Sequence, residues 1–101
     1  MMLGGISDTE KPVTEELKMM LIRVQPEVLD EVRKSFNGPV VYLIPVSYES
    51  QMVAGVNYFV KYQLNESKVY YHVRIYKDLD NYLKVVRVSG PKTEADPIKY
   101  F

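Results

Sequence analysis

The sequence has no cysteine, no tryptophan and a single histidine, His72. Without cysteine the chain can form no disulfide framework, no thiol nucleophile and no thiolate metal site. Acid–base or metal-assisted catalysis would therefore have to use carboxylates, lysines and tyrosines, and no cluster of these residues with catalytic spacing is visible. We predict from these absences that the protein is not an enzyme and that it has no catalytic residues, metal or cofactor.

The chain also lacks an excess of charge of either sign, because 13 Lys and Arg residues balance 13 Asp and Glu residues. No long-range field therefore draws it to nucleic acid or to an anionic membrane. No stretch approaches the ~20 apolar residues of a membrane span, and no secretory leader follows Met1. We expect a cytoplasmic protein that forms one domain over residues 1–101, without nucleic-acid or membrane partners.

Residues 1–13 have the composition of a mobile N-terminal arm. They contain the pair Gly4-Gly5, the polar residues 7–9 and Pro12, which do not favour a packed element. The arm nevertheless begins with three apolar residues, so two interpretations stay open at this point. Either the segment is a frayed tail, or its apolar end contacts a partner.

A helical pattern follows the arm. Thr14 is a good N-cap, and the two acidic residues after it suit the positive end of a helix dipole. We predict one long helix that runs to about Ser35, with a bend or local break at Pro26, and that ends at Gly38 and Pro39. Apolar residues recur along it at steps of three and four, on one stripe: Leu17, Met20, Leu21, Val24, Val28 and Val32.

After the helix the apolar pattern changes to a period of two, which is typical of strands. Short connections between successive strands make neighbours antiparallel, so the sequence predicts an α+β fold in which a four- to five-stranded antiparallel sheet wraps around the helix. Pro45 implies a bulge or an edge position, and His72 is expected on the exposed face of its strand. The predicted strands cover residues 40–50, 56–64, 68–77 and 84–89, with a short terminal strand at 98–101.

The tip of the first predicted hairpin is apolar, whereas hairpin tips are usually polar. Its residues are Gln51-Met52-Val53-Ala54-Gly55. With Gly4 upstream, one helix before the hairpin and Tyr100-Phe101 at the end, the sequence resembles the cystatin superfamily and its Gln-x-Val-x-Gly loop. More narrowly, it resembles the stefins, which are intracellular cystatins without disulfides. The resemblance covers essentially the whole chain.

The resemblance implies a reversible, tight-binding, competitive inhibitor of papain-like cysteine proteases such as cathepsins. In the cystatins that the sequence resembles, the N-terminal arm and two hairpin loops form a wedge that enters the protease cleft. In the arm, the glycine would let Leu3 and its neighbour occupy substrate subsites, with Leu3 in the main specificity pocket. The residues that the resemblance places against the protease are Met2, Leu3, Gly4, Gln51, Met52, Val53, Ala54, Gly55, Leu79, Asp80 and Asn81.

The second hairpin departs from the stefin pattern. Stefins usually have Leu-Pro in this loop, whereas this chain has Leu79 followed by Asp80. Because proline pre-sets a turn, Asp80→Pro is expected to strengthen inhibition, unless Asp80 pairs with a basic group of one particular protease. Tyr82 either supplies the lost contact surface or is an ordinary strand-surface tyrosine.

A second class of function stays open beside the inhibitor. The same fold, natural or engineered as a scaffold, could act as a non-inhibitory binding or assembly module. A strained turn at Val53 is a plausible hinge through which two copies exchange strands. We therefore expect a monomer, with a domain-swapped dimer as the alternative state.

Overall fold

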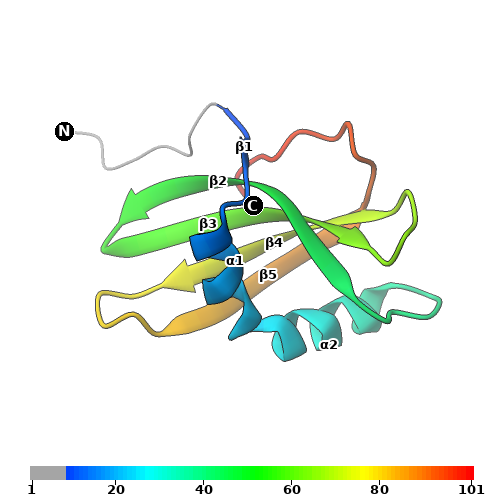
Figure 1. Cartoon of the computed structure of the whole chain (residues 1–101), viewed down its shortest axis with the longest axis horizontal. Coiled ribbons are helices and arrows are strands. Elements are labelled where there is room, and N and C mark those ends of the chain that lie inside the picture. The colour runs from blue at the N-terminus through cyan, green and yellow to red at the C-terminus, as the bar shows by residue number, and fades with distance from the viewer. Residues whose placement is uncertain (1–8) are drawn as a thin grey trace.

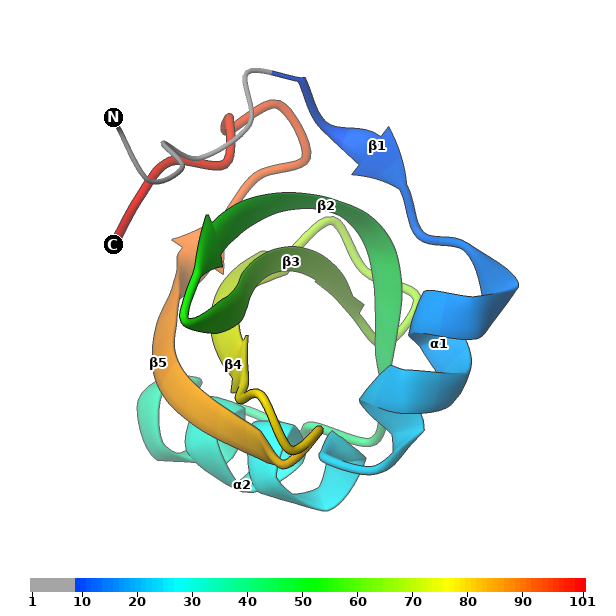
Figure 2. The ribbon, with the colours of Figure 1, turned by 90° about the vertical axis from the view of Figure 1, so that its left-hand side faces the viewer.

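The computed structural model describes residues 9–101 of the chain. Within this range the sheet has five antiparallel strands in the order β1-β2-β3-β4-β5, and its curvature leaves an open side across which the two helices lie (Figures 1 and 2). The predicted α+β class is confirmed. The elements are β1 (Lys11–Pro12), α1 (Glu15–Ile22), α2 (Gln25–Ser35), β2 (Leu43–Val53), β3 (Gly55–Leu64), β4 (Tyr70–Lys77) and β5 (Leu83–Lys92).

The prediction of one long helix is wrong, because the helical segment is broken between Ile22 and Gln25. Pro26 lies in the first turn of α2, where its missing amide leaves no hydrogen bond unmade. In an unbroken helix its ring would clash with the carbonyl of Ile22, so α1 ends there. The local break expected at Pro26 is therefore confirmed, although it divides the segment into two helices. The predicted N-cap is also confirmed, since the Leu17 amide donates to Thr14 Oγ1 at 3.1 Å.

The predicted apolar stripe crosses the break and forms the helical half of the core. Leu17, Leu21, Val24, Val28 and Val32 are buried, and Met20 packs against them. Two turns of helix before the break and three after it therefore present one continuous apolar surface to the concave face of the sheet. The sheet contributes Leu43, Val60, Tyr62, Leu64, Tyr71, Val73 and Ile75 to the same cluster.

Four predicted strands are confirmed, with boundaries shifted by a few residues, but the terminal strand at residues 98–101 is wrong. That segment instead packs on the convex face, where the Phe59 ring lies 5.7 Å from the rings of both Tyr100 and Phe101. The fifth strand is β1, which pairs with Ser47 and Tyr48 and which the sequence had placed in the arm. The bulge predicted at Pro45 is confirmed by a register shift between Pro45 and Ser47.

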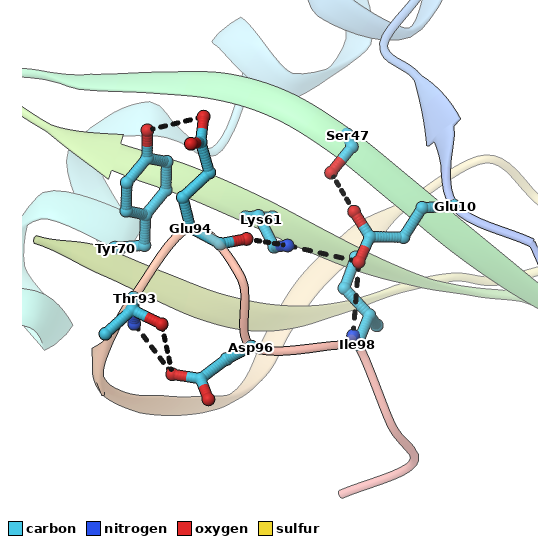
Figure 3. Close-up of polar contacts among 8 residues, drawn as sticks. All are labelled: Glu10, Ser47, Lys61, Tyr70, Thr93, Glu94, Asp96 and Ile98. Atoms are coloured by element: carbon cyan, nitrogen blue, oxygen red, sulfur yellow. Dashed lines mark hydrogen bonds and ion pairs between the residues drawn. The ribbon is translucent and has the colours of Figure 1, made fainter. Parts of the chain in front are cut away.

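Residues 93–101, the C-terminal segment, bind to the convex face through a set of polar contacts (Figure 3). Lys61 Nζ lies 3.1 Å from Glu10 Oε1 and donates to the Glu94 carbonyl at 2.8 Å. The other carboxylate oxygen of Glu10 accepts from Ser47 Oγ at 2.7 Å, and Glu10 Oε1 also accepts from the Ile98 amide at 3.3 Å. These contacts join the residues before β1, the sheet and the C-terminal segment.

His72 lies on this convex face, and its expected exposure is wrong. The side chain is 1% exposed, and its Nε2 has no hydrogen-bond partner among the described residues. Burial, together with the positive charges of Lys61 and Lys92, lowers the pKa of the His72 imidazole to about 4. His72 is therefore a neutral, buried side chain at physiological pH.

Candidate functional site

The two hairpins that the resemblance placed in the site lie at the same end of the sheet. The β2–β3 turn and the β4–β5 loop both point to the left in Figure 1, away from the α2–β2 connection and the β3–β4 turn. We call this end of the molecule the hairpin edge, made of residues 51–55 and 78–82. Met2, Leu3 and Gly4, the third part of the predicted wedge, lie outside the described residues.

The first hairpin turns over a single residue. Val53 is the partner of Gly55 across the turn, so that Ala54 alone joins β2 to β3. Met52 is 65% exposed and Ala54 is also exposed, while Val53 is half-buried. The hairpin therefore presents the apolar tip that the sequence indicated.

Gly55 is required at the turn for two separate reasons. Its φ of +111° lies outside the range that other residues readily adopt. A Cβ at this position would also lie 2.3 Å from the carbonyl oxygen of Lys77 in β4. The glycine thus lets the first hairpin approach the end of β4 closely.

Two side-chain contacts fix the first hairpin from its base and from its neighbour. The side-chain nitrogen Nδ2 of Asn57 donates to Gln51 Oε1 at 3.0 Å, so the side chain of Gln51 links β2 to β3. The Tyr76 hydroxyl, which belongs to β4, donates to the carbonyl of Ala54. Sequence reasoning missed Tyr76, because its contact depends on the register in which β4 pairs with β3 beside the turn.

The second hairpin is organised by Asp78, another residue that sequence reasoning missed. Asp78 Oδ1 accepts from the amide of Asp80 at 2.8 Å and from the amide of Tyr82 at 2.9 Å. The backbone closes the loop further, since the Asp78 amide donates to the Tyr82 carbonyl at 3.0 Å. An Asp at the start of a turn is a known signal for such side-chain-to-backbone bonds and could have identified it.

The second hairpin exposes two large side chains, Leu79 at 78% and Tyr82 at 72%. Asn81 has a φ of +68°, which asparagine tolerates better than most residues. Leu79 and Tyr82 therefore lie on a loop whose backbone is held by internal hydrogen bonds.

The hairpin edge offers apolar surface and backbone groups. Residues 9–101 contain no group of three or more His, Cys, Asp or Glu side chains that could hold a metal ion.

The amide of Asp80 changes what a proline at this position would do. Sequence reasoning expected Asp80→Pro to strengthen inhibition by stiffening the turn. In the structure the Asp80 amide is a hydrogen-bond donor to Asp78, and proline has no amide hydrogen to donate. The substitution would therefore remove one of the bonds that hold the loop.

Comparison with known proteins gives full-length relatives. Cystatin-A of Mus musculus is 31% identical over the whole length of both chains, and cystatin-B of Bos taurus is 33% identical over the whole length of both. A Sus scrofa protein named leukocyte cysteine proteinase inhibitor 1 is 27% identical over all of this chain and 95% of its own. No model of a protein family matches the chain.

None of the described helices is long and apolar enough to cross a membrane.

Proposed function

Because the chain belongs to the stefin group of the cystatin family, whose members are inhibitors of cysteine proteinases and not enzymes, we propose that it is a reversible, tight-binding, competitive inhibitor of papain-like proteases such as cathepsins. In this proposal residues 1–101 act as a single domain in the cytoplasm. The hairpin edge and the N-terminal arm close the active-site cleft. The function is exclusion of substrate and involves no chemical step.

The observation that carries the proposal is the apolar tip of the first hairpin. Met52 and Ala54 are exposed on a turn that is fixed by Gly55, Gln51 and Tyr76. A protease cleft is a preformed and partly apolar groove, so insertion of this tip removes apolar surface from water on both partners. Because the turn is already ordered, little conformational entropy is lost when it binds.

The second hairpin extends this surface in the proposal. Leu79 and Tyr82 are the exposed side chains that would contact the wall of the cleft, and tyrosine is frequent among the residues that dominate interfaces. Asp80 and Asn81 shape the loop between them. Leu79 thus keeps the role that the resemblance gave it, although no proline follows it.

The proposal is tested by titration of papain and two cathepsins with the purified protein. We expect inhibition at one inhibitor per active site, relieved by increasing substrate concentration, as competition for the cleft requires. Full protease activity in the presence of a large excess of folded protein would contradict the proposal and favour the assembly module.

Deletion of Met1 to Gly4 is expected to speed dissociation of the papain complex about tenfold. The truncated chain would no longer place Leu3 and Met2 in the substrate subsites, and affinity differences at one interface appear mainly in the dissociation rate. Stopped-flow or surface plasmon resonance measures this rate, and thermal unfolding should be unchanged. Equal dissociation rates for both chains against every protease tested would show that the arm is only a tail.

Asp80→Pro is expected to weaken inhibition about fivefold, the scale of one lost hydrogen bond in a binding loop. The proline removes the amide that donates to Asp78 Oδ1 and loosens the second hairpin before binding. The inhibition constant for papain checks this at low and high salt. Stronger inhibition would restore the expectation drawn from the sequence, and loss of salt dependence would indicate that Asp80 pairs with a basic group of the protease.

The oligomeric state decides between the inhibitor and the assembly module. We propose a monomer, because β2 and β3 pair with each other from Leu43 with Leu64 to Val53 with Gly55. In a swapped dimer these strands would pair with a second copy, and Ala54 would continue an extended strand in place of the turn. The apolar tip would then be lost, so a stable dimer in size-exclusion chromatography should fail to inhibit papain.

A further inference from the structure

A long-range hydrogen bond joins the helix break to the hairpin edge. Arg23 is one of the two residues between α1 and α2, and its Nη2 donates to the carbonyl of Asn81 at 2.8 Å. The two residues are 58 positions apart in the sequence. The break therefore places a cationic side chain against the second hairpin, and Figure 2 shows the two segments close together below the barrel-like curve of the sheet.

The contact is made at Asn81, between the two residues whose amides bind the Asp78 side chain. Asp78 binds the amides of Asp80 and Tyr82, which lie on either side of Asn81. The Asn81 amide donates to the Asp78 carbonyl at 3.1 Å, while the Asn81 carbonyl accepts from the Arg23 guanidinium. Asp78 thus stabilises the loop through bonds within the loop itself, and Arg23 binds the loop to the connection between the two helices.

We propose that Arg23 is a positioning residue for inhibition, a role that rests on the proposed function. It fixes the second hairpin so that Leu79 and Tyr82 face the protease in the free protein as they do in the complex. A charged donor makes a stronger hydrogen bond to a carbonyl than a neutral donor does. Asp78 and Arg23 together thereby supply the preorganisation that a proline would otherwise give this loop.

Arg23→Ala is expected to speed dissociation of the papain complex about fivefold to tenfold, without a change in thermal unfolding. The loop would then have to be ordered during binding, and this cost appears as weaker affinity. Arg23→Lys keeps the charge and one donor, so it should recover part of the effect. Because thermal unfolding is unchanged, recovery of the dissociation rate by Arg23→Lys could not be due to restored stability of the fold.

Arg33→Ala is the matched control. Arg33 Nε and Nη2 donate to the Val40 carbonyl at 3.2 and 2.8 Å, which is the same kind of bond at the other end of the sheet (Figure 1). Its loss should leave the dissociation rate of the papain complex unchanged. An equal effect of both substitutions would overturn the proposal, because it would show a general loss of stability.

Amide hydrogen exchange of Asp80 and Tyr82 in the free protein tests the positioning directly. The proposal requires faster exchange of both amides in Arg23→Ala, together with faster dissociation. Faster dissociation with unchanged exchange would mean that Arg23 contacts the protease itself, and faster exchange with unchanged dissociation would mean that the loop does not bind. Either result overturns the proposal.

Failure of the proposed function can be told apart from failure of this inference. If the wild-type chain does not inhibit papain, the proposed function fails, whereas the exchange rates still decide whether Arg23 holds the loop.

Discussion

Val53→Asp is expected to weaken inhibition of papain at least a hundredfold while leaving the fold intact. Val53 is half-buried at the turn of the first hairpin, where a carboxylate in the free protein can turn to water. In the complex the same carboxylate would be covered by the cleft without a partner, and burial of an unpaired charge costs several kcal/mol. The inhibition constant and the unfolding temperature are measured on the same preparation.

Val41→Asp is the matched control for this substitution. Val41 is 68% exposed and precedes β2 at the opposite end of the sheet from the hairpin edge (Figure 1). The Val41→Asp variant should inhibit papain as well as the wild type does. If Val53→Asp loses thermal stability in proportion to its loss of inhibition, Val53 supports packing of the hairpin and does not enter the cleft.

The free energy of unfolding is expected to fall by about 3 kcal/mol as the pH decreases from about 6.5 to about 4, through His72 alone. The folded protein lowers the pKa of this imidazole from 6.5 to about 4, so the unfolded chain binds the proton first. Stability from the neutral imidazole is therefore present above pH 6.5 and lost as the pH falls. The neighbouring charges are Lys61 and Lys92, which lower the pKa, and Glu10 and Asp96, which raise it less.

Urea unfolding at several pH values separates this effect from other titrations. His72 is the only histidine, so the decline between pH 6.5 and 5 belongs to it. His72→Gln keeps a polar side chain of similar size without a titrating group, and its stability should stay nearly level over that interval. The pKa of Glu10 is lowered by its bonds to Ser47 and Lys61 against the opposing effect of burial, so its contribution is lost only at more acidic pH. Equal slopes for the wild type and His72→Gln would contradict the prediction.

The parts of the fold that sequence predicts well are those with local causes. The first hairpin follows from alternating apolar residues on both sides of a glycine whose positive φ its turn requires, and the start of α1 follows from the Thr14 cap. The helix break is less visible, because Leu21, Val24 and Val28 continue the same apolar stripe across it. Only Pro26 signals the break, and a proline is compatible with a bend as well as with two helices.

The features that sequence missed depend on residues far apart in the chain. Strand alternation correctly placed His72 opposite the core, but its side chain is buried there, on the face to which the C-terminal segment binds through Lys61. No local pattern directs that segment to this face. The contacts of Tyr76 with Ala54 and of Arg23 with Asn81 likewise join residues that come together only in the folded chain. Family resemblance supplied the loops of the proposed site, and the structure supplied the side chains that hold them.

The contact between Glu10 and Ile98 also bears on the order of folding events. It joins residues 88 positions apart, so it closes almost the entire chain into one loop. Loop closure over such a distance has a large entropic cost, and contacts of this range form after the local hairpins and helices. A contact absent from the transition state acts mainly on the rate of unfolding. The Glu10–Ile98 contact thus contributes to how long each folded molecule persists more than to how quickly it forms.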